Sequence, residues 1–282
     1  MSTHNTLSVA VSSGGMKGAF TLGALHGLQN TQAQIIELVG SSSGSLNAAY
    51  FVAGQTDVAR DAYRHLISTD FIYTDRGMPK MDIELAWRLI FGANSPFQLD
   101  MNAVMSSDVE LKIPLLNIDT GREEVFSNRD EQSIFTAALK AAIAVPVWYG
   151  DSVVINGQRY IDGGVVNPLP LSLISNPNSR VIGVSSKQRP FSYIPSGVIF
   201  SQYAQRNYGS TRRQALQTRD DKVSNIEAAQ RLAVDRQALI IQPEILLHQL
   251  INTRSLVDKA FIAGEQAAAE MRQNAAPFPV LG

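Results

Sequence analysis

The sequence contains no cysteine, few histidines and almost no net charge. Its 282 residues carry 24 Lys and Arg against 25 Asp and Glu, with four His. The absence of cysteine excludes disulfides, thiol catalysis and cysteine-ligated metals. Four scattered histidines make no metal-binding cluster, and a balanced charge offers no electrostatic basis for binding nucleic acid. We therefore expect no metal and no nucleic-acid partner.

Long apolar runs and a secretory leader are also missing. No apolar run reaches the roughly 18 residues that a membrane-spanning helix needs. The segment before residue 7 has neither the basic start nor the apolar stretch of a signal peptide. These features predict a cytoplasmic protein without a transmembrane segment. A hydrophobic content of 45% with 17% charged residues is typical of a globular protein, and the length fits one large α/β domain or two small ones.

The pattern Gly-x-Ser-x-Gly occurs once between a strand-like and a helix-like segment. Gly40-Ser41-Ser42-Ser43-Gly44 follows the apolar run 34–39 and precedes the small-residue helix predicted over 46–54. A strand that turns into a helix within a few residues holds its central serine exposed and strained, and flanking glycines allow the two backbones to approach. Ser42 is therefore a candidate nucleophile. A serine- and glycine-rich loop without a catalytic role is the alternative.

A second strand-to-helix turn is rich in glycine. Ser12 to Gly18 connects a predicted strand over 7–11 to a predicted helix over 19–28. Such a turn presents free backbone N–H groups and the positive end of a helix dipole. The spacing is not that of a P-loop, and Ser13 breaks the dinucleotide fingerprint, so an oxyanion is the better ligand. Parallel strands would bring this loop beside Ser42, unless both turns are ordinary tight loops.

A third chemical segment follows a predicted hairpin. Strands over 153–155 and 159–161 flank Asn156-Gly157, a frequent two-residue turn, and lead into Asp162-Gly163-Gly164. An aspartate at the end of an apolar strand, followed by two glycines, indicates that another group approaches closely. An ordinary Asp-Gly turn is the alternative.

The rest of the chain is assigned from periodicity and turn signals. The predicted elements are helices over 58–67, 83–91, 132–145 (ended by Pro146), 211–236 and 253–272, antiparallel strands over 111–118 and 123–126, and late strands over 180–185 and 238–242. Residues 56–107 are the least regular, and an irregular connection over 74–79 separates the helices predicted over 58–67 and 83–91. The aromatic and apolar side chains of that region form either core or an acyl-chain pocket; they are Phe71, Ile72, Tyr73, Trp87, Leu89, Ile90, Phe91 and Phe97.

Two further features have alternative interpretations. Basic residues between Arg206 and Lys222 could meet anionic lipid headgroups, but interleaved acidic residues favour a solvated helix face.

A Ser–His–Asp triad needs a histidine between the nucleophile and the acid. Each of the four histidines is poorly placed for this role: His4, His26, His65 and His248. Only His248 follows Asp162 as the order Ser, Asp, His requires, and it lies in a helix-like segment. A dyad, in which Asp162 takes the proton of Ser42 directly, is the simpler hypothesis.

Together, the three motifs resemble those of the patatin-like phospholipases. Gly14 to Gly18 resembles the family's Gly-Gly-x-Arg/Lys-Gly loop, 40–44 its elbow, and 162–164 its Asp-Gly-Gly/Ala motif. Residues 141–146 resemble the helix end before the aspartate hairpin of bacterial members. The resemblance covers about residues 7–186, and Ser13 departs from the usual glycine of the loop.

The resemblance implies a three-layer α/β/α sandwich with a mainly parallel central sheet. It implies one domain over 7–274, with a motif-bearing core over 7–186, a helix-rich part over 187–274 and no second domain. It also implies a lipid acyl hydrolase without a cofactor, acting on phospholipids or other acyl lipids and contacting a membrane at most peripherally. An acyltransferase and a non-catalytic lipid-binding protein are the alternatives. The oligomeric state is not indicated.

The resemblance further assigns roles to individual residues. Ser42 would be the nucleophile and Asp162 the base. The oxyanion would be held at the loop Gly14, Gly15, Met16, Lys17 and Gly18 together with Ser43, where backbone N–H groups are the donors and Lys17 adds positive potential or anchors the loop. The motif glycines are Gly40, Gly44, Gly163 and Gly164.

Overall fold

The computed structural model describes residues 6–29, 31, 33–75, 77–191, 208–209, 212–244, 247 and 253–274, and every structural statement below concerns these residues. An eight-stranded sheet has the order β10-β9-β1-β2-β5-β8-β7, with β6 paired to β5. Its strands are β1 (Thr6–Val11), β2 (Gln34–Gly40), β5 (Glu110–Asn117), β6 (Arg122–Ser127), β7 (Val153–Ile155), β8 (Gln158–Asp162), β9 (Arg180–Val184) and β10 (Leu239–Ile241). A separate hairpin pairs β3 (Ile72–Asp75) with β4 (Met78–Met81).

The sheet separates a larger apolar core from a smaller one, and a third cluster of buried apolar residues includes Leu116, Ile161 and Val166. Strands β10, β9, β1, β2 and β5 run parallel, and β6, β7 and β8 are added in antiparallel pairings. Successive side chains of a strand point to opposite faces. In β1, Val9 and Val11 accordingly lie in the larger core, while Ala10 lies in the smaller one. Central parallel strands are buried on both faces because helices cover them both.

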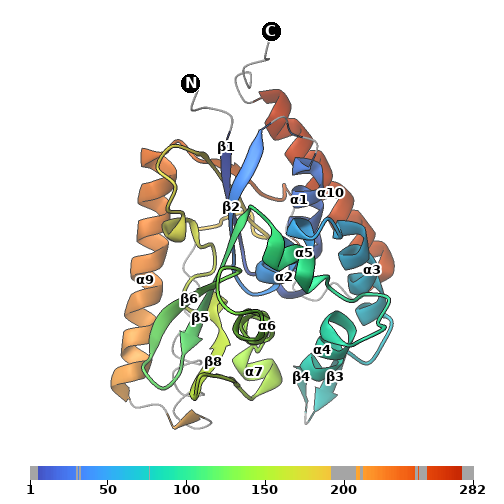
Figure 1. Ribbon diagram of the computed structural model, residues 1–282, viewed down its shortest axis with the longest axis vertical. Helices are drawn as coiled ribbons and strands as arrows, with labels where there is room; N and C mark the ends of the chain where they lie inside the picture. Colours follow the sequence, from blue (N-terminus) through green and yellow to red (C-terminus); the bar gives the residue numbers. More distant parts are fainter. Residues whose placement is uncertain are drawn as a thin grey trace.

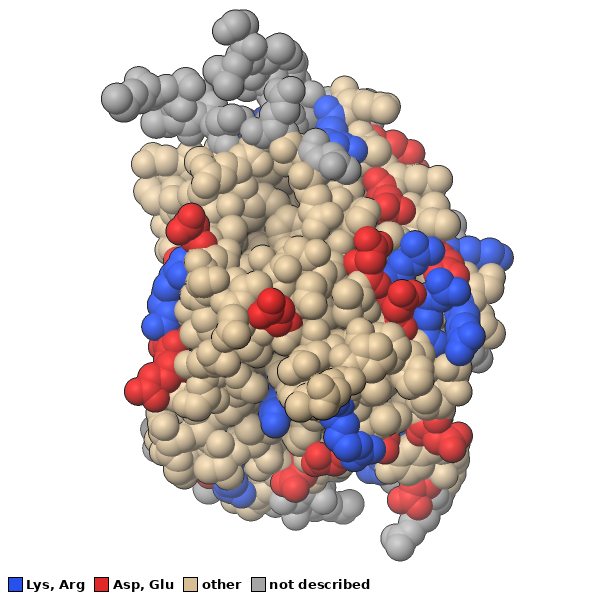
Figure 2. All heavy atoms as spheres, turned by 45° about the vertical axis from the view of Figure 1, so that its right-hand side comes forward, with Lys and Arg blue, Asp and Glu red and all other residues tan. Residues whose placement is uncertain are grey.

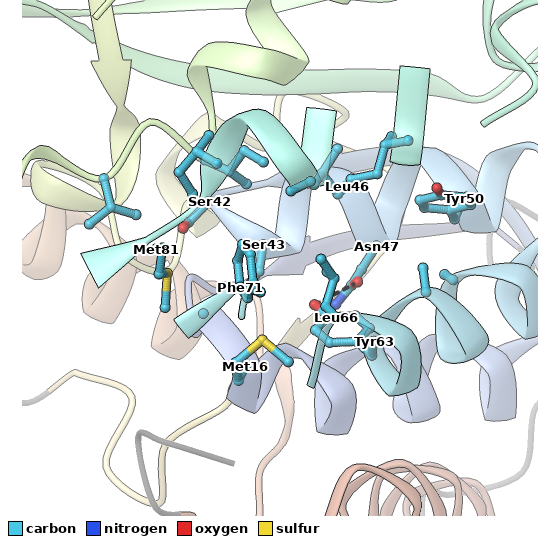
Figure 3. A pocket seen from close by; sticks show the side chains of 18 residues that line it. Met16, Ser42, Ser43, Leu46, Asn47, Tyr50, Tyr63, Leu66, Phe71 and Met81 are labelled. Atoms are coloured by element: carbon cyan, nitrogen blue, oxygen red, sulfur yellow. Dashed lines mark hydrogen bonds between the residues drawn. The ribbon is translucent and has the colours of Figure 1, made fainter. Parts of the chain in front are cut away.

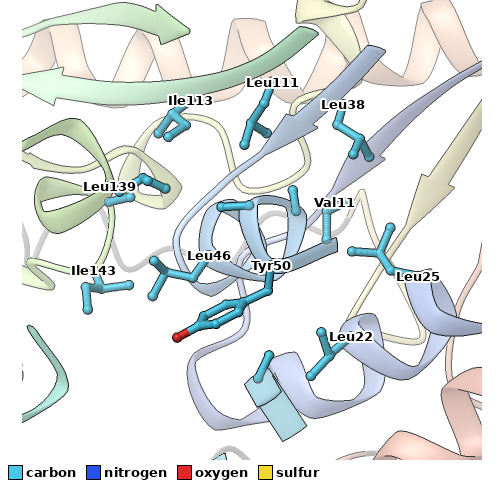
Figure 4. Packing of buried hydrophobic residues seen from close by; sticks show 14 of the residues in the cluster. Val11, Leu22, Leu25, Leu38, Leu46, Tyr50, Leu111, Ile113, Leu139 and Ile143 are labelled. Carbon is cyan, nitrogen blue, oxygen red and sulfur yellow. The ribbon is translucent and has the colours of Figure 1, made fainter. Parts of the chain in front are cut away.

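Helices form a layer on each side of the sheet. They are α1 (Gly18–Leu28), α2 (Ser43–Val52), α3 (Thr56–Ile67), α4 (Ile83–Phe91), α5 (Met101–Ser106), α6 (Gln132–Ala141), α7 (Pro146–Tyr149), α9 (Arg212–Asp235) and α10 (Arg254–Asn274). Figure 1 shows α9 along one side and α1, α3 and α10 on the other. Figure 4 shows Leu22, Leu46 and Tyr50 of the helices in the larger core, together with Leu38 and Leu111 of the sheet. The predicted mixed α/β fold with a mainly parallel central sheet is confirmed.

The C-terminal helix α10 packs closely on α1. A Cβ atom on Gly23 would lie 1.9 Å from Phe261 O, and one on Gly264 would lie 2.1 Å from Phe20 O. Only glycine allows two helix backbones to approach this closely. Because α1 directly follows the glycine-rich loop, α10 supports the helix on which that loop is built.

Three local predictions need correction. The irregular connection expected around 74–79 is the turn region of the β3–β4 hairpin, in which Gly77 takes a φ of 80°. The helix predicted over 132–145 ends at Ala141, and Pro146 starts α7, where a missing N–H costs no hydrogen bond. The helix after the elbow begins at Ser43 and not at Leu46. The remaining predicted elements are present with ends shifted by a few residues.

Candidate active site

Ser42 occupies the tight turn between β2 and α2. Its φ of 57° and ψ of −130° are unusual for a residue with a Cβ atom and indicate stored strain. A Cβ atom on Gly40 would lie 2.6 Å from Gly44 O, and one on Gly44 would lie 2.6 Å from Val11 O. Glycine is therefore required at both positions, as a nucleophile elbow demands.

Asp162 lies beside Ser42 at the end of β8. The Ser42 hydroxyl donates to Asp162 Oδ2 at 2.6 Å, and the Gly164 N–H donates to Asp162 Oδ1 at 2.7 Å. Both side chains of this Ser–Asp pair are buried. Burial raises the pKa of Asp162 to about 7, against the lowering effect of the two hydrogen bonds. A carboxylate in this position can accept the serine proton near neutral pH.

The two glycines after Asp162 allow close packing around it. A Cβ atom on Gly163 would lie 2.0 Å from Pro114 O, and one on Gly164 would lie 2.9 Å from Ser13 Cβ. Gly163 thus fits against β5, and Gly164 brings the aspartate turn against the start of the glycine-rich loop. The groups that approach the Asp162-Gly163-Gly164 motif closely are therefore the backbone of Pro114 and the side chain of Ser13.

The glycine-rich loop presents backbone donors to the site. Within the described part of the chain, no acceptor takes a hydrogen bond from the N–H groups of Gly14, Gly15 and Met16, or from that of Ser43. Gly15 has a φ of 55°, which favours glycine. Gly15 and Met16 line the same cavity as Ser42 and Ser43. These N–H groups can therefore stabilise a negative oxygen in that cavity.

The outer side of the loop meets the segment after β9. A Cβ atom on Gly14 would lie 2.9 Å from Ser186 Oγ, and the Ser186 hydroxyl donates to Ser13 O at 2.7 Å. Lys17 is buried, and burial together with the positive charge of Lys187 lowers the pKa of its ammonium group. Burial and the charge of Lys187 therefore both disfavour the charged form of Lys17 beside the loop.

A buried polar network fastens the loop to two helices. Tyr63 Oη donates to Asn47 Oδ1 at 3.1 Å, while Asn47 Nδ2 donates to Gly18 O at 2.8 Å and to Thr21 Oγ1 at 2.9 Å. A Cβ atom on Gly18 would lie 2.3 Å from Tyr63 Oη. Asn47 and Tyr63 were not predicted from the sequence, because only the packing of α1, α2 and α3 brings these polar atoms together.

An apolar cavity opens beside Ser42 (Figure 3). Its empty space, including the opening, is about 650 Å³. Its walls come from α2, α3 and α4, from Phe71 and Met81 at the open end of the β3–β4 hairpin, and from Ile143 and Val145 after α6. Of the aromatic and apolar stretch that was predicted as core or acyl pocket, Phe71 and Ile90 line the cavity, whereas Trp87 and Phe91 pack on the main core.

The described histidines have partners outside the Ser–Asp pair. His26 Nδ1 shares a hydrogen bond with Thr56 Oγ1 at 2.8 Å, and the His65 ring packs against Phe97 with centroids 4.9 Å apart. His4 and His248 lie outside the described residues. Neither described histidine bonds to Ser42 or Asp162 in this part of the chain.

The described residues also bear on the sequence-based expectations for metal sites, membrane-spanning helices and charged surface patches. In the segments that the structure describes, no cluster of acidic or histidine side chains could hold a metal, and no helix has the length and apolar character to cross a bilayer. Figure 2 shows positive and negative side chains interspersed around a broad uncharged area. In the basic stretch of α9, Arg219 pairs with Asp220 at 2.9 Å, as on a solvated helix face, whereas Arg206 lies outside the described residues.

Comparison with known proteins identifies the family. "Uncharacterized protein YjjU" of Escherichia coli (strain K12) is 24% identical over 183 residues, which are 63% of this chain and 51% of that protein, so the chain spans about half the length of this curated relative. The crystal structure of VipD from Legionella pneumophila aligns over 96% of this chain and 67% of its own, with 12% identity and a TM-score of 0.49. The family profile described as "Patatin-like phospholipase" matches residues 9–174. This match takes in all three motifs, and the chain therefore belongs to the patatin-like phospholipases, a family of lipid acyl hydrolases.

Proposed function

We propose that this chain hydrolyses carboxylic esters of acyl lipids through a Ser42–Asp162 dyad and a covalent acyl-enzyme. The 2.6 Å hydrogen bond from Ser42 Oγ to Asp162 Oδ2 carries the proposal, because it pairs a strained elbow serine directly with a base. The family and the apolar cavity beside Ser42 support a lipid as the substrate.

In the first half-reaction, Ser42 Oγ attacks the ester carbonyl carbon while Asp162 takes the hydroxyl proton. The carbonyl oxygen becomes negative and is held by the N–H donors of the glycine-rich loop and of Ser43. When the tetrahedral intermediate collapses, the bond to the leaving alcohol breaks and Asp162 returns the proton to that alcohol. The acyl group is then an ester of Ser42.

Water completes the reaction by the same steps in reverse order. Asp162 takes a proton from water as the water oxygen attacks the acyl carbon, and the same N–H donors hold the second oxyanion. Collapse of this intermediate releases the fatty acid and gives the proton back to Ser42 Oγ. An ordinary carboxylate with a pKa of about 3.9 would be a weak base for both steps. The pKa of about 7 that burial gives Asp162 makes the proton transfers more favourable.

Hydrolysis of a panel of p-nitrophenyl esters and phospholipid vesicles tests this proposal. We expect activity that Ser42→Ala abolishes and that Ser41→Ala keeps. Ser41 is a matched control because it is the neighbouring serine of the same turn, and its buried hydroxyl has no hydrogen-bond partner among the described residues. A fluorophosphonate should label the wild type and the Ser41→Ala variant but not Ser42→Ala. Full activity of Ser42→Ala would disprove the assignment of Ser42 as the nucleophile. Hydrolysis of phospholipids in vesicles also tests the predicted peripheral membrane contact.

Two variations of the mechanism are separated by further measurements. Product analysis with and without a glycerolipid acceptor distinguishes hydrolysis from transfer of the same acyl group. Replacement of His248 by Gln distinguishes the dyad from a triad, because loss of a triad histidine costs several orders of magnitude in rate. We expect a change of less than about tenfold for His248→Gln.

A further inference from the structure

The cavity beside Ser42 has a defined direction. One face of α2 lines it, with side chains at Ser43, Leu46, Asn47 and Tyr50. Residues three and four positions apart lie on one side of a helix, so these side chains form a row along the helix axis. Figure 3 shows this row running from Ser42 through Leu46 and Asn47 to Tyr50. A chain attached to Ser42 can therefore extend along α2.

Small side chains keep the cavity open along that row. Ala59 and Ala62 of α3 and Ala86 of α4 contribute walls without filling the space, and larger apolar side chains such as Leu66 complete the lining. Packed protein interiors leave few voids, and unfilled apolar space lowers stability. An apolar cavity that opens at a strained serine therefore has the properties of a binding site for an apolar ligand.

Tyr50 forms a fixed wall at the far end of the row. Its side chain is 2% exposed, and its hydroxyl donates to Phe97 O at 2.5 Å. The segment that carries Phe97 is held to the connection between α2 and α3 by a second contact, because the Asp100 N–H donates to Gln55 Oε1 at 2.8 Å. The aromatic ring is thus held by its packing and by its polar end, so it does not swing aside as readily as a surface tyrosine.

The distance from Ser42 to this wall limits the acyl chain. Tyr50 lies seven positions after Ser43, which is about 10 Å along a helix that rises 1.5 Å per residue. Carbon–carbon bonds of about 1.5 Å advance an extended chain by roughly 1.3 Å per carbon. We propose that the row from Ser42 to Tyr50 measures the acyl group and selects chains of about eight carbons, with Tyr50 as the specificity-determining residue. This inference rests on the proposed ester hydrolysis at Ser42.

Chain-length profiles of kcat/KM, from p-nitrophenyl acetate to palmitate, test the inference with two opposed variants. Wild type should be fastest near the octanoate. Tyr50→Ala should raise the palmitate-to-octanoate ratio by at least about tenfold, since each additional buried methylene is worth roughly fourfold. Leu46→Trp fills the middle of the row and should move the optimum to the butyrate. General destabilisation cannot shift the two profiles in opposite directions, and Tyr50→Phe, which keeps the ring, should leave the profile unchanged.

A binding measurement separates this inference from the proposed function. The Ser42→Ala variant should be stabilised most in thermal melts by fatty acid methyl esters of medium length, and adding Tyr50→Ala should move that optimum to longer esters. If hydrolysis depends on Ser42 but neither substitution changes the chain-length profile, the proposal that Tyr50 selects the acyl length is wrong, while the proposed hydrolase function stands. If the protein hydrolyses no ester but the binding optimum shifts as expected, the proposed hydrolase function is wrong, while the proposal that Tyr50 selects the acyl length stands.

Discussion

At the residue scale, the pKa of Asp162 decides the pH range in which the site can work. Burial raises this pKa to about 7, and only the ionised carboxylate can accept the Ser42 proton. We expect kcat/KM to rise with pH and to reach half of its maximum near pH 7, because this parameter reports the free enzyme. Initial rates on a soluble ester between about pH 4 and pH 9 measure the profile. A midpoint near pH 4 would show that the base has an ordinary carboxyl pKa.

The same pKa has a consequence for stability. Because the pKa of Asp162 is higher in the folded than in the unfolded chain, its contribution to stability is full below about pH 4 and is lost as the pH rises to about 7. Asn cannot ionise. We therefore expect the difference in melting temperature between Asp162→Asn and wild type to grow in favour of the variant over this interval and to level off above it. A difference in melting temperature that is the same at about pH 4 and at about pH 8 would contradict this.

Site residues can be predicted from the sequence where a short motif requires that residue type at that position. Gly40 and Gly44 could be predicted from the Gly-x-Ser-x-Gly pattern between a strand and a helix. The structure gives the physical reason, since a Cβ atom at either would lie 2.6 Å from a backbone oxygen. Asp162 could be predicted from its unusual position before two glycines. Tyr63 and Asn47 could not, since nothing in their own segments indicates that they share a network with the loop. Burial that raises a pKa is likewise a property of the assembled fold.

At the element scale, the glycine-rich loop is the part of the site most sensitive to backbone change. Gly15 has a φ of 55°, and a Cβ atom there would meet Trp148 only at 3.8 Å, so valine would act through backbone strain and not through a clash. Gly15→Val should lower kcat by about a hundredfold or more with less effect on KM, because the N–H donors contact the oxyanion most strongly in the transition state. Steady-state kinetics separate the two parameters.

Lys17→Met is the comparison for that prediction. It removes a buried charge near an existing donor loop without changing the backbone, so it should cost kcat about tenfold to a hundredfold, less than Gly15→Val. The reverse pattern, an intact kcat for Gly15→Val with lost affinity for anionic lipid in Lys17→Met, would mean that the loop binds a headgroup phosphate.

Helices and strands can be predicted from the sequence where the pattern of apolar residues matches the faces that the fold buries. Strands β1 and β2 are mainly apolar because both faces of their central residues are buried; the buried polar residues Ser8 and Glu37 are exceptions that hydrogen-bond to each other. The Asn156-Gly157 turn determines the β7–β8 pairing. The β3–β4 hairpin lacks that support. Tyr73 is 45% exposed, and the hairpin is a separate two-stranded sheet that touches the larger core only through residues such as Ile72 and Met81 at its open end. Its short strands therefore have no strong apolar alternation.

At the scale of the whole molecule, the C-terminal region lies outside the family match yet contacts a helix of the site. The family profile ends at residue 174, whereas α10 packs on α1 with Phe261 almost fully buried. We propose that residues 7–274 fold as one domain, with α10 as part of its core. A change in α10 should then lower the stability of the active-site half as well, in one cooperative transition.

Gly264→Val tests this proposal. The Cβ atom of any larger residue would lie 2.1 Å from Phe20 O, so the helices must separate, and overpacking of this kind costs about 1–3 kcal/mol or more. For a chain of this size, that loss lowers the melting temperature by several degrees, at roughly 2–4 °C per kcal/mol. Gln266→Val adds the same side chain on the exposed side of α10 and should change little. Melting curves followed by circular dichroism and by residual esterase activity should shift together for Gly264→Val. If the activity curve stayed at the wild-type temperature while part of the helical signal melted early, α10 would be a separate unit.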